Sequence, residues 1–369
     1  MNMSEIQLSG FNILLILCLL LCCGNIAQLV WNKEVYNPQK KIIELSSAYI
    51  LSRSIHVAAS MKLADYFIEK PYSIDKLADK INVNSDALYR LFRLLASHNI
   101  FYESEHRVFS ITPLAELLTS AHPESLQAWL AFHDGDENRW RSYGNMEYSI
   151  RTGEPVFNHL FGSGFFDVLA KDPTKSEAFD EGMRNISEKE ELEISSSFDF
   201  SHYANIMDIG GGKGGLLKAI IQNNPVIHGI LFDLPHAQIP AELYLAENGL
   251  ADRVSFEPGS FFDEISSGSD LYILKRILHD WDDQQCIKIL ANCRKAMKKH
   301  TKLLIIEAIV EPGNKSNIIK EIDLAMLLLF GGKERTQNEW DLLLHAAGLQ
   351  CVSVHKTSSM LSILEVIQK

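Results

Sequence analysis

The feature that most constrains the fold of this chain is a glycine-rich run at residues 205–215, Asn-Ile-Met-Asp-Ile-Gly-Gly-Gly-Lys-Gly-Gly. The run begins with apolar residues typical of a buried strand, and Asp208 lies where that strand ends. Residues 216–221 then have the composition of a helix. A strand, a glycine turn and a helix in this order form a nucleotide-binding crevice, because glycines allow a tight turn and a close approach of the ligand. A carboxylate at this edge suits a ligand that carries a positive amino group.

A second strand that ends in an acid follows at the expected distance. Residues 228–233 read His-Gly-Ile-Leu-Phe-Asp, which predicts a strand ending at Asp233. In dinucleotide-binding units, an acid roughly 20 residues downstream binds the ribose, and we expect Asp233 to bind its two hydroxyls. A nicotinamide cofactor and S-adenosylmethionine both contain that ribose, so the two motifs alone do not separate them.

Strands and helices continue to alternate up to the C-terminus. They predict an α/β fold over residues 201–369, with a doubly wound, mostly parallel, Rossmann-like sheet. Ligands bind at the carboxyl ends of the strands of such a sheet. Further strands are expected at residues 254–256, 270–274 and 302–306, with a closing pair at residues 351–355 and 361–367.

Candidate functional residues collect at these strand ends. Lys275 and His279 follow one strand, Glu307 ends the next, and Glu334 follows a long apolar helix. Histidine has an ordinary pKa of about 6.5 and can accept a proton near neutral pH. A neighbouring carboxylate would fix its tautomer and stabilise the imidazolium. The alternatives are a local role for His279 at a helix N-terminus and a solvated strand end for Glu307.

The region upstream of the sheet is predicted to be mostly helical. Residues 41–122 have the pattern of a winged helix-turn-helix, with apolar residues three or four apart and a hairpin near residues 101–111. The net charge of −12 and the lack of a basic stripe disfavour nucleic acid as a partner and favour a protein-interaction domain. Residues 123–200 form a helical linker rich in aromatic residues and Met, some of which could line an apolar small-molecule pocket.

The N-terminal 40 residues are an apolar extension of uncertain role. Residues 11–23 are nearly all Leu, Ile and Cys, but their densest part is shorter than the ~20 residues of a membrane-spanning helix. Three interpretations stay open: a membrane anchor, a helix buried in a dimer, and an extension upstream of the true start. The three cysteines beyond this run follow no disulfide or metal-ligand spacing, which favours a reducing compartment. We therefore expect a cytoplasmic protein, with membrane attachment through residues 11–23 as an alternative.

From about residue 41 to residue 369, the chain resembles the S-adenosylmethionine-dependent O-methyltransferases of the caffeic acid and hydroxyindole type, including their bacterial small-molecule members. The motifs that carry this resemblance are Asp208–Gly214, Phe232–His236, Lys275 followed by His279-Asp280-Trp281, Glu307, Gly331–Thr336 with Ala347-Gly348, and Arg151–Pro155, which resembles the bacterial branch.

The resemblance implies a role for each matching residue. His279 would be the general base, with Glu307 and Glu334 flanking and orienting it. The winged-helix domain would form a homodimer, and the enzyme would need no metal. Ser260 departs from the pattern, because the family usually has Asp at this position contacting the adenosine. The residues implied to bind S-adenosylmethionine are Asp208, Gly210, Gly212, Asp233, Leu234, Ser260, Phe261, Lys275, Trp281 and Ser187, and those implied to line the acceptor pocket are Phe179, Met183, Met326 and Phe330.

The function predicted on this basis is the transfer of a methyl group from S-adenosylmethionine to a hydroxyl, expected to be phenolic, of a small aromatic or polyketide-like molecule. One alternative is a winged-helix regulator that binds S-adenosylmethionine, although a basic recognition face is missing. Another is an NAD-dependent dehydrogenase, against which the motif at residues 331–336 and the closing strand pair both count. A third keeps the fold and the cofactor but changes the reaction.

Overall fold

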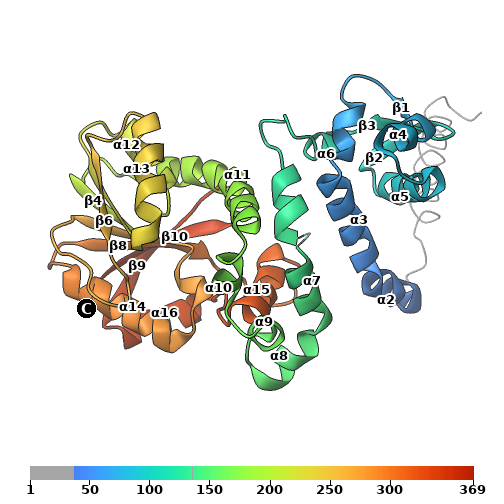
Figure 1. Cartoon of the computed structure of the whole chain (residues 1–369). Coiled ribbons are helices and arrows are strands. Elements are labelled where there is room, and N and C mark those ends of the chain that lie inside the picture. Colours follow the sequence, from blue (N-terminus) through green and yellow to red (C-terminus); the bar gives the residue numbers. More distant parts are fainter. Residues whose placement is uncertain (1–36, 135) are drawn as a thin grey trace, which may run out of the picture. The chain divides into compact units, whose positions relative to one another are not determined.

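The computed structural model describes residues 37–134 and 136–369 (Figure 1). The chain divides into two compact units, residues 1–54 and 55–369, which are described separately. In the described part of the first unit, helix α2 (Pro38–Ser46) is followed by the start of α3 (Ala48–Ser60). Asn37 caps α2 by accepting a hydrogen bond from the Lys40 N–H, and Pro38 occupies the first helical turn. Large apolar side chains are exposed on these helices: Ile42, Ile43, Leu45, Tyr49 and Ile50.

The predicted location, a cytoplasmic protein with membrane attachment as the alternative, is corrected by the structure. Among residues 37–134 and 136–369, no helix is both long enough and apolar enough to cross a membrane. Helix α11 (Pro173–Ser197) has the length, with 25 residues, but charged residues recur along it. The apolar run at residues 11–23, on which the attachment rested, lies outside the described residues. The prediction is therefore withdrawn.

The first part of the second unit is the predicted winged helix. A three-stranded antiparallel sheet has the order β1-β3-β2, and the rings of Phe67, Phe92, Phe101 and Phe109 pack together beneath it. Asn84 caps the second helix of the motif by accepting the Ala87 N–H. The elements are η1 (Leu63–Phe67), β1 (Tyr72–Ser73), α4 (Ile74–Ile81), α5 (Ser85–Ser97), β2 (Phe101–Glu105), β3 (Val108–Ile111) and α6 (Pro113–Glu116).

A series of short helices follows and leads into the long helix α11. Buried Val156, Phe157 and Phe165 pack with Leu328 and Leu329, which come from the C-terminal half of the chain. This segment is therefore part of the same core as the helix that precedes Glu334. Its elements are η2 (Trp129–Asp134), α7 (Glu137–Gly144), α8 (Met146–Thr152), α9 (Val156–Phe161), α10 (Phe165–Leu169) and α11.

The C-terminal sheet has seven strands in the order β6-β5-β4-β7-β8-β10-β9. Strands β4 to β8 are parallel, whereas β10 lies antiparallel between β8 and β9. The predicted mostly parallel, doubly wound sheet with its closing pair is thus confirmed. The strands are β4 (Asn205–Ile209), β5 (His228–Asp233), β6 (Val254–Pro258), β7 (Leu271–Lys275), β8 (Lys302–Ala308), β9 (Leu349–Lys356) and β10 (Leu361–Gln368).

Helices cover both faces of this sheet, as Figure 1 shows for α12 and α13 on one side and α14 and α16 on the other. Side chains that alternate along each strand go to opposite cores: Ile206 packs with α12 and α13, and Met207 packs with α14 and α16. These elements are α12 (Gly215–Asn223), η3 (Pro235–Ala237), α13 (Gln238–Glu247), η4 (Leu278–Asp280), α14 (Asp283–Ala296), α15 (Ile318–Leu329) and α16 (Gln337–Ala346).

The strand order places the ligand site. From β4 the chain runs outward through β5 to β6 and then returns to β7 on the other side of β4. Ligands of doubly wound sheets bind at the carboxyl ends of the strands where the order reverses. The glycine turn after β4 and the His279 segment after β7 therefore meet at this edge.

Candidate active site

The glycine turn is held in shape by the end of the neighbouring strand. Gly210 and Gly212 have φ of +73° and +58°, a backbone conformation that glycine adopts without strain. The Gly210 N–H donates to the Phe232 carbonyl at 2.7 Å, and the Gly212 N–H donates to Oδ2 of Asp233 at 2.8 Å. Asp233 also accepts the N–H of Leu234, a residue that is itself exposed. The two acid-ended strands found in the sequence are thus joined by a direct hydrogen bond.

A group of charged side chains lies below the turn. Asp208 is buried against Gly211, where a side chain would collide with its carboxylate. Burial raises the pKa of Asp208 to about 7, although the positive charge of Lys275 opposes the rise. Lys275 Nζ lies 3.2 Å from a carboxylate oxygen of Glu191, which comes from α11. Burial also raises the pKa of Glu191, again opposed by Lys275. Sequence reasoning missed Glu191, since nothing in the charged run around it distinguishes one acid from the next.

Aromatic rings flank the same edge. The Trp281 ring packs edge-on against Phe262, with centroids 4.8 Å apart, and against Phe261 at 6.0 Å. Phe261 also lies close to Gly210. The Ser260 hydroxyl accepts the Phe262 N–H at 3.2 Å, so this side chain is already engaged in a local turn. Ser187 lies half-buried on α11.

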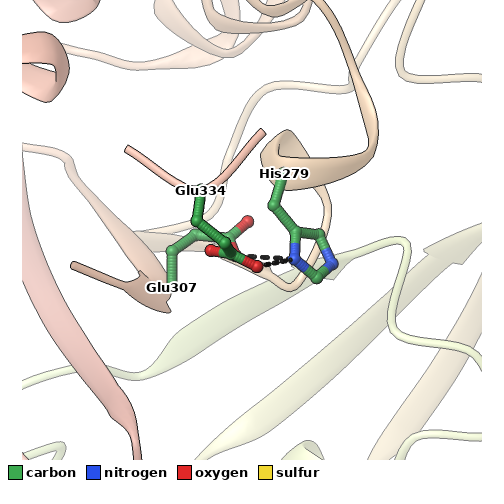
Figure 2. Close-up of side chains that lie close together, drawn as sticks. All are labelled: His279, Glu307 and Glu334. Carbon is green, nitrogen blue, oxygen red and sulfur yellow. Dashed lines mark hydrogen bonds and ion pairs between the residues drawn. The ribbon is translucent and has the colours of Figure 1, made fainter. Parts of the chain in front are cut away.

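His279 is buried in the short helix η4, and its ring is held by a carboxylate. Nδ1 lies 2.7 Å from Oε1 of Glu334 and 3.9 Å from Oε2 of Glu307. Figure 2 shows both carboxylates on the Nδ1 side of the ring. An ionised Glu334 can only accept, so Nδ1 carries the proton of this hydrogen bond, and Nε2 is the nitrogen that can take up another. The nearest carboxylate to Nε2 is Asp280, at 3.6 Å.

The two glutamates contact the His279 segment in different ways. Glu334 bonds the imidazole, and its own N–H donates to Asp323 on α15 at 3.0 Å. Oε1 of Glu307 instead accepts the backbone N–H groups of Ile277 and Leu278, at 3.0 and 2.9 Å. Oε2 of Glu307 is buried without a hydrogen bond among the described residues. Glu307 thus holds the backbone before the histidine, and Glu334 holds its ring.

The buried charges around His279 control its proton affinity. Burial alone would lower the pKa of His279, but the negative charges of Glu307 and Asp280 and the hydrogen bond to Glu334 outweigh it and raise the pKa to about 10. Burial raises the pKa of Glu307 and of Asp280, and in both cases the His279 charge opposes the rise. An imidazolium at this position is therefore strongly stabilised.

His279, Glu307 and Glu334 also have the residue types of a metal site, and their nearest ligand atoms lie within 4.8 Å of one another. Ligand atoms of a tetrahedral zinc ion, with bonds of about 2.0–2.1 Å, are roughly 3.3 Å apart. The 2.7 Å between His279 Nδ1 and Glu334 is shorter and is that of a charge-assisted hydrogen bond. The arrangement is thus that of a histidine oriented by carboxylates.

The predicted acceptor-pocket residues are divided between two helices. Phe179 on α11 and Phe330 after α15 both pack against the rings of Phe165 and Phe166, with centroids 5.0–6.3 Å apart. Met326 is buried on α15, and Met183 is half-buried on α11. Sequence reasoning noted Phe165 and Phe166 only as aromatics of this region, since nothing local shows which rings will meet.

This aromatic cluster is linked to the histidine by buried charge. The Arg139 guanidinium lies 4.9 Å from the centroid of the Phe165 ring, and its charge acts on Asp280, the residue after His279. Before His279 in the chain, Arg276 forms an ion pair with Glu190 of α11 through two hydrogen bonds, at 2.5 and 3.0 Å. No local pattern indicates the Arg276 pairing, because its partner is 86 residues away.

The sequence matches two family models. Residues 43–121 match the O-methyltransferase dimerisation domain, and residues 143–350 match the O-methyltransferase domain. Together they span most of the described chain.

Individual relatives agree with these matches. Phenazine O-methyltransferase PhzM of Lysobacter antibioticus is 39% identical over 324 residues, which are 88% of this chain and 94% of that protein. A crystal structure of an O-methyltransferase, NcsB1, from neocarzinostatin biosynthesis, in complex with S-adenosylmethionine and 2-hydroxy-5-methyl naphthoic acid, has a TM-score of 0.76 at 30% identity and covers 86% of this chain and 96% of its own. The 8-amino-8-demethylriboflavin N,N-dimethyltransferase of Streptomyces davaonensis is 30% identical, over 88% of this chain and 92% of that protein.

Proposed function

Because this chain belongs to the family of S-adenosylmethionine-dependent O-methyltransferases, as its two domain matches show, we propose that it methylates a phenolic hydroxyl of a small aromatic or polyketide-like molecule, with His279 as the general base. The chain is a methyltransferase, and its cofactor is S-adenosylmethionine. The observation that carries the proposal for His279 is its hydrogen bond to Glu334, which leaves Nε2 as the nitrogen that can accept a proton.

The residues of the crevice fit this cofactor. Asp208, Glu191 and Asp233 provide carboxylates for a ligand that carries a positive sulfur and an ammonium group. Gly210 is a position where a side chain would fill the turn, since a Cβ would lie 2.6 Å from Ile277. We assign the ribose to Asp233 and the adenine edge to the rings of Phe261 and Trp281.

When bound, S-adenosylmethionine supplies a methyl group on a positively charged sulfur, so the protein has to place and deprotonate the acceptor. His279 takes the hydroxyl proton at Nε2, and Glu334 keeps the ring in the required tautomer. Proton transfer is efficient when the donor and the base have similar pKa values. A phenol, with a pKa of about 10 like that of tyrosine, gives up its proton more readily than an aliphatic alcohol, and the carboxylates around His279 stabilise the imidazolium that forms.

The aromatic cluster of the helical segment supports an aromatic acceptor. The rings of Phe165, Phe166, Phe179 and Phe330 provide flat apolar surface, as small-molecule sites usually do. The names of two relatives, a phenazine O-methyltransferase and an enzyme crystallised with a naphthoic acid, support fused or substituted rings. The relative that methylates an amine makes an aromatic amine the second candidate acceptor.

We also propose that the chain is a homodimer. The dimerisation-domain match supports this, and so do the exposed apolar side chains Ile42, Leu45 and Tyr49 within that match or beside it. Sedimentation velocity at micromolar concentration should give twice the 41.7 kDa of one chain, and a monomer at all concentrations would contradict this proposal.

The experiment that tests the proposed function begins with calorimetric titration of S-adenosylhomocysteine, NAD and buffer into the protein. Saturable binding of S-adenosylhomocysteine alone is expected. A panel of phenols, aliphatic alcohols and aromatic amines is then assayed with a labelled methyl donor. Transfer to phenols that His279→Ala abolishes supports the proposal, while transfer only to amines, or none despite cofactor binding, would overturn the phenol assignment.

A further inference from the structure

The backbone that carries His279 has little regular structure of its own. Between β7 and α14 there is only the three-residue helix η4. Arg276, at its start, has φ of +54°, a conformation that side chains disfavour. The position of the imidazole therefore depends on what holds this segment, defined as residues 276–283, from outside.

Arg335 holds the segment through its backbone carbonyls. The side chain is fully buried, and it donates from Nη1 to the Leu278 carbonyl at 2.9 Å and from Nη2 to the Trp281 carbonyl at 3.0 Å. These carbonyls lie on either side of His279. Nε and Nη2 also donate to one carboxylate oxygen of Asp283, at 3.1 and 2.8 Å. Only the planar, forked guanidinium can reach three such acceptors at once.

The buried charge of Arg335 is compensated and its plane is fixed. Burial by itself would raise the pKa of Asp283, but the hydrogen bond and charge of Arg335 lower it, so the pair is ionised. The guanidinium also lies 5.3 Å from the centroid of the Trp340 ring. The Asp283 carboxylate and the Trp340 ring thus keep the guanidinium in one orientation.

The stretch around Arg335 is itself tied to the strand that carries Glu307. The Val310 N–H donates to the Arg335 carbonyl at 3.0 Å, and Ile309 and Arg335 form an isolated parallel bridge just beyond β8. Two residues earlier than Glu334, Gly332 packs so closely on the segment that a Cβ would collide with the His279 carbonyl. Neighbouring residues 334 and 335 thus hold the ring and the backbone of the same histidine.

We infer that Arg335 is a positioning residue for the methyl transfer, which locks the backbone on both sides of His279 so that the ring stays bonded to Glu334 and presents Nε2 to the acceptor. The inference rests on the proposed role of His279 as the base. It adds a residue that touches neither cofactor nor acceptor and acts through the backbone segment that carries His279.

The test compares Arg335→Lys, Arg335→Gln and the control Lys333→Gln. Lys333 binds the other oxygen of the same Asp283 carboxylate at 3.2 Å, but it has no bond to the carbonyls around His279. If the forked geometry of the guanidinium positions His279, Arg335→Lys lowers kcat by about 10- to 100-fold although lysine keeps the positive charge. A loss of this size is expected for a misplaced catalytic group. S-adenosylhomocysteine affinity falls much less than kcat, because Arg335 holds only the backbone of Trp281 at the adenine edge, and Lys333→Gln behaves as wild type.

A second readout does not depend on turnover. The His279 ring is titrated by NMR with isotope-labelled histidine, and its signal is assigned by its loss in His279→Gln. In Arg335→Lys the His279 pKa should fall towards the ordinary value, because the bond to Glu334 loosens, whereas Lys333→Gln should leave it in place. Unchanged His279 titration in a folded Arg335→Lys protein overturns the inference even if no acceptor is ever found.

Two further measurements separate the positioning role of Arg335 from misfolding of the variant and from the proposed role of His279 as the base. If Arg335→Gln fails to fold, the changes in kcat and in the His279 titration are measured in Arg335→Lys and in Asp283→Asn, which removes the partner charge. Both variants should lose less stability than Arg335→Gln. If His279→Ala retains full turnover while Arg335→Lys still shifts the His279 titration, the proposed base is wrong but the positioning of the ring stands. Wild-type kcat together with wild-type titration in Arg335→Lys would contradict the inference alone.

Discussion

The cofactor crevice and the His279 segment lie side by side at one sheet edge, yet they are built in opposite ways. The glycine turn of the crevice is built from backbone after β4, and two hydrogen bonds, Gly210 to Phe232 and Gly212 to Asp233, join it to the end of the neighbouring strand. The His279 segment is irregular and is held by side chains from elsewhere in the chain, namely Glu307, Glu334 and Arg335. The glycine turn can therefore be recognised from a local motif, whereas the geometry proposed for His279 depends on three segments meeting.

The largest effect should come from the centre of the second region. His279→Ala is expected to lower kcat by about 10²–10⁴-fold, the usual value of a positioned base. Affinity for S-adenosylhomocysteine should not change, since none of the crevice hydrogen bonds involves this residue. Parallel kinetics and calorimetry check this, and a loss of cofactor affinity equal to the loss of kcat would show that the two regions are not separate.

Gly210 tests whether the regions are mechanically independent. A Cβ at Gly210 would lie 2.6 Å from Ile277, which precedes His279 by two residues, and the position also needs φ of +73°. Gly210→Ala should therefore weaken S-adenosylhomocysteine binding by about tenfold, since a left-handed conformation costs an alanine roughly 1–2 kcal/mol, and it should lower kcat as well. Calorimetry and turnover measure the two effects.

Gly212→Ala is the matched control for that prediction. Gly212 also has positive φ, but a Cβ there would meet nothing within 4 Å. It should weaken cofactor binding through backbone strain and leave kcat at saturating cofactor unchanged. Equal kcat losses in the two variants would remove Ile277 as the link between the regions.

The pH dependence distinguishes the two glutamates. The proposed base is the neutral form of His279, and nearby negative charges raise its pKa to about 10, so kcat/KM should rise towards alkaline pH. Glu334→Gln removes one of these charges and therefore lowers the pKa, which moves the rise to lower pH. The maximal rate should fall by about tenfold, because the ring is held less well. The measurement is a pH profile with one phenol for both proteins.

Glu307→Gln sharpens the same comparison. Its Oε1 accepts two backbone N–H groups, which an amide oxygen can still do, whereas its charge is the largest of those that raise the His279 pKa. The profile should again move to lower pH, but with a smaller loss of maximal rate than in Glu334→Gln. If neither variant moves the profile, the titrating group is the phenol and not His279.

The smallest effect is expected at the adenosine edge. The Ser260 hydroxyl accepts the Phe262 N–H, and it keeps an O–H donor and a second lone pair for a ligand but carries no charge. Ser260→Asp keeps an oxygen for that bond and adds a charged acceptor, which should tighten S-adenosylhomocysteine binding by about fivefold, equivalent to roughly 1 kcal/mol. Calorimetry on both proteins decides, and unchanged or weaker binding would count against adenosine contact at this position.

The sequence predicts the structure of the cofactor crevice better than the contacts of the His279 segment. The winged helix, the parallel sheet and the glycine turn have local patterns, and the structure has them where the sequence placed them. His279, Glu307 and Glu334 could be named, because strand ends of a doubly wound sheet converge. The sequence could not show which glutamate bonds the ring, because that depends on a difference of about 1 Å: Nδ1 of His279 lies 2.7 Å from Glu334 and 3.9 Å from Glu307.

The sequence by itself determined where this protein's strands, turns and acid-ended motifs lie, because hydrophobic periodicity and glycine act over a few residues. Only the tertiary structure decided that Glu307 holds backbone, that Arg335 holds the carbonyls around His279, and that Arg276 pairs with Glu190. These are contacts of buried charged groups across 29 to 86 residues. A buried charge must find a partner, but chain folding alone decides which partner comes within reach.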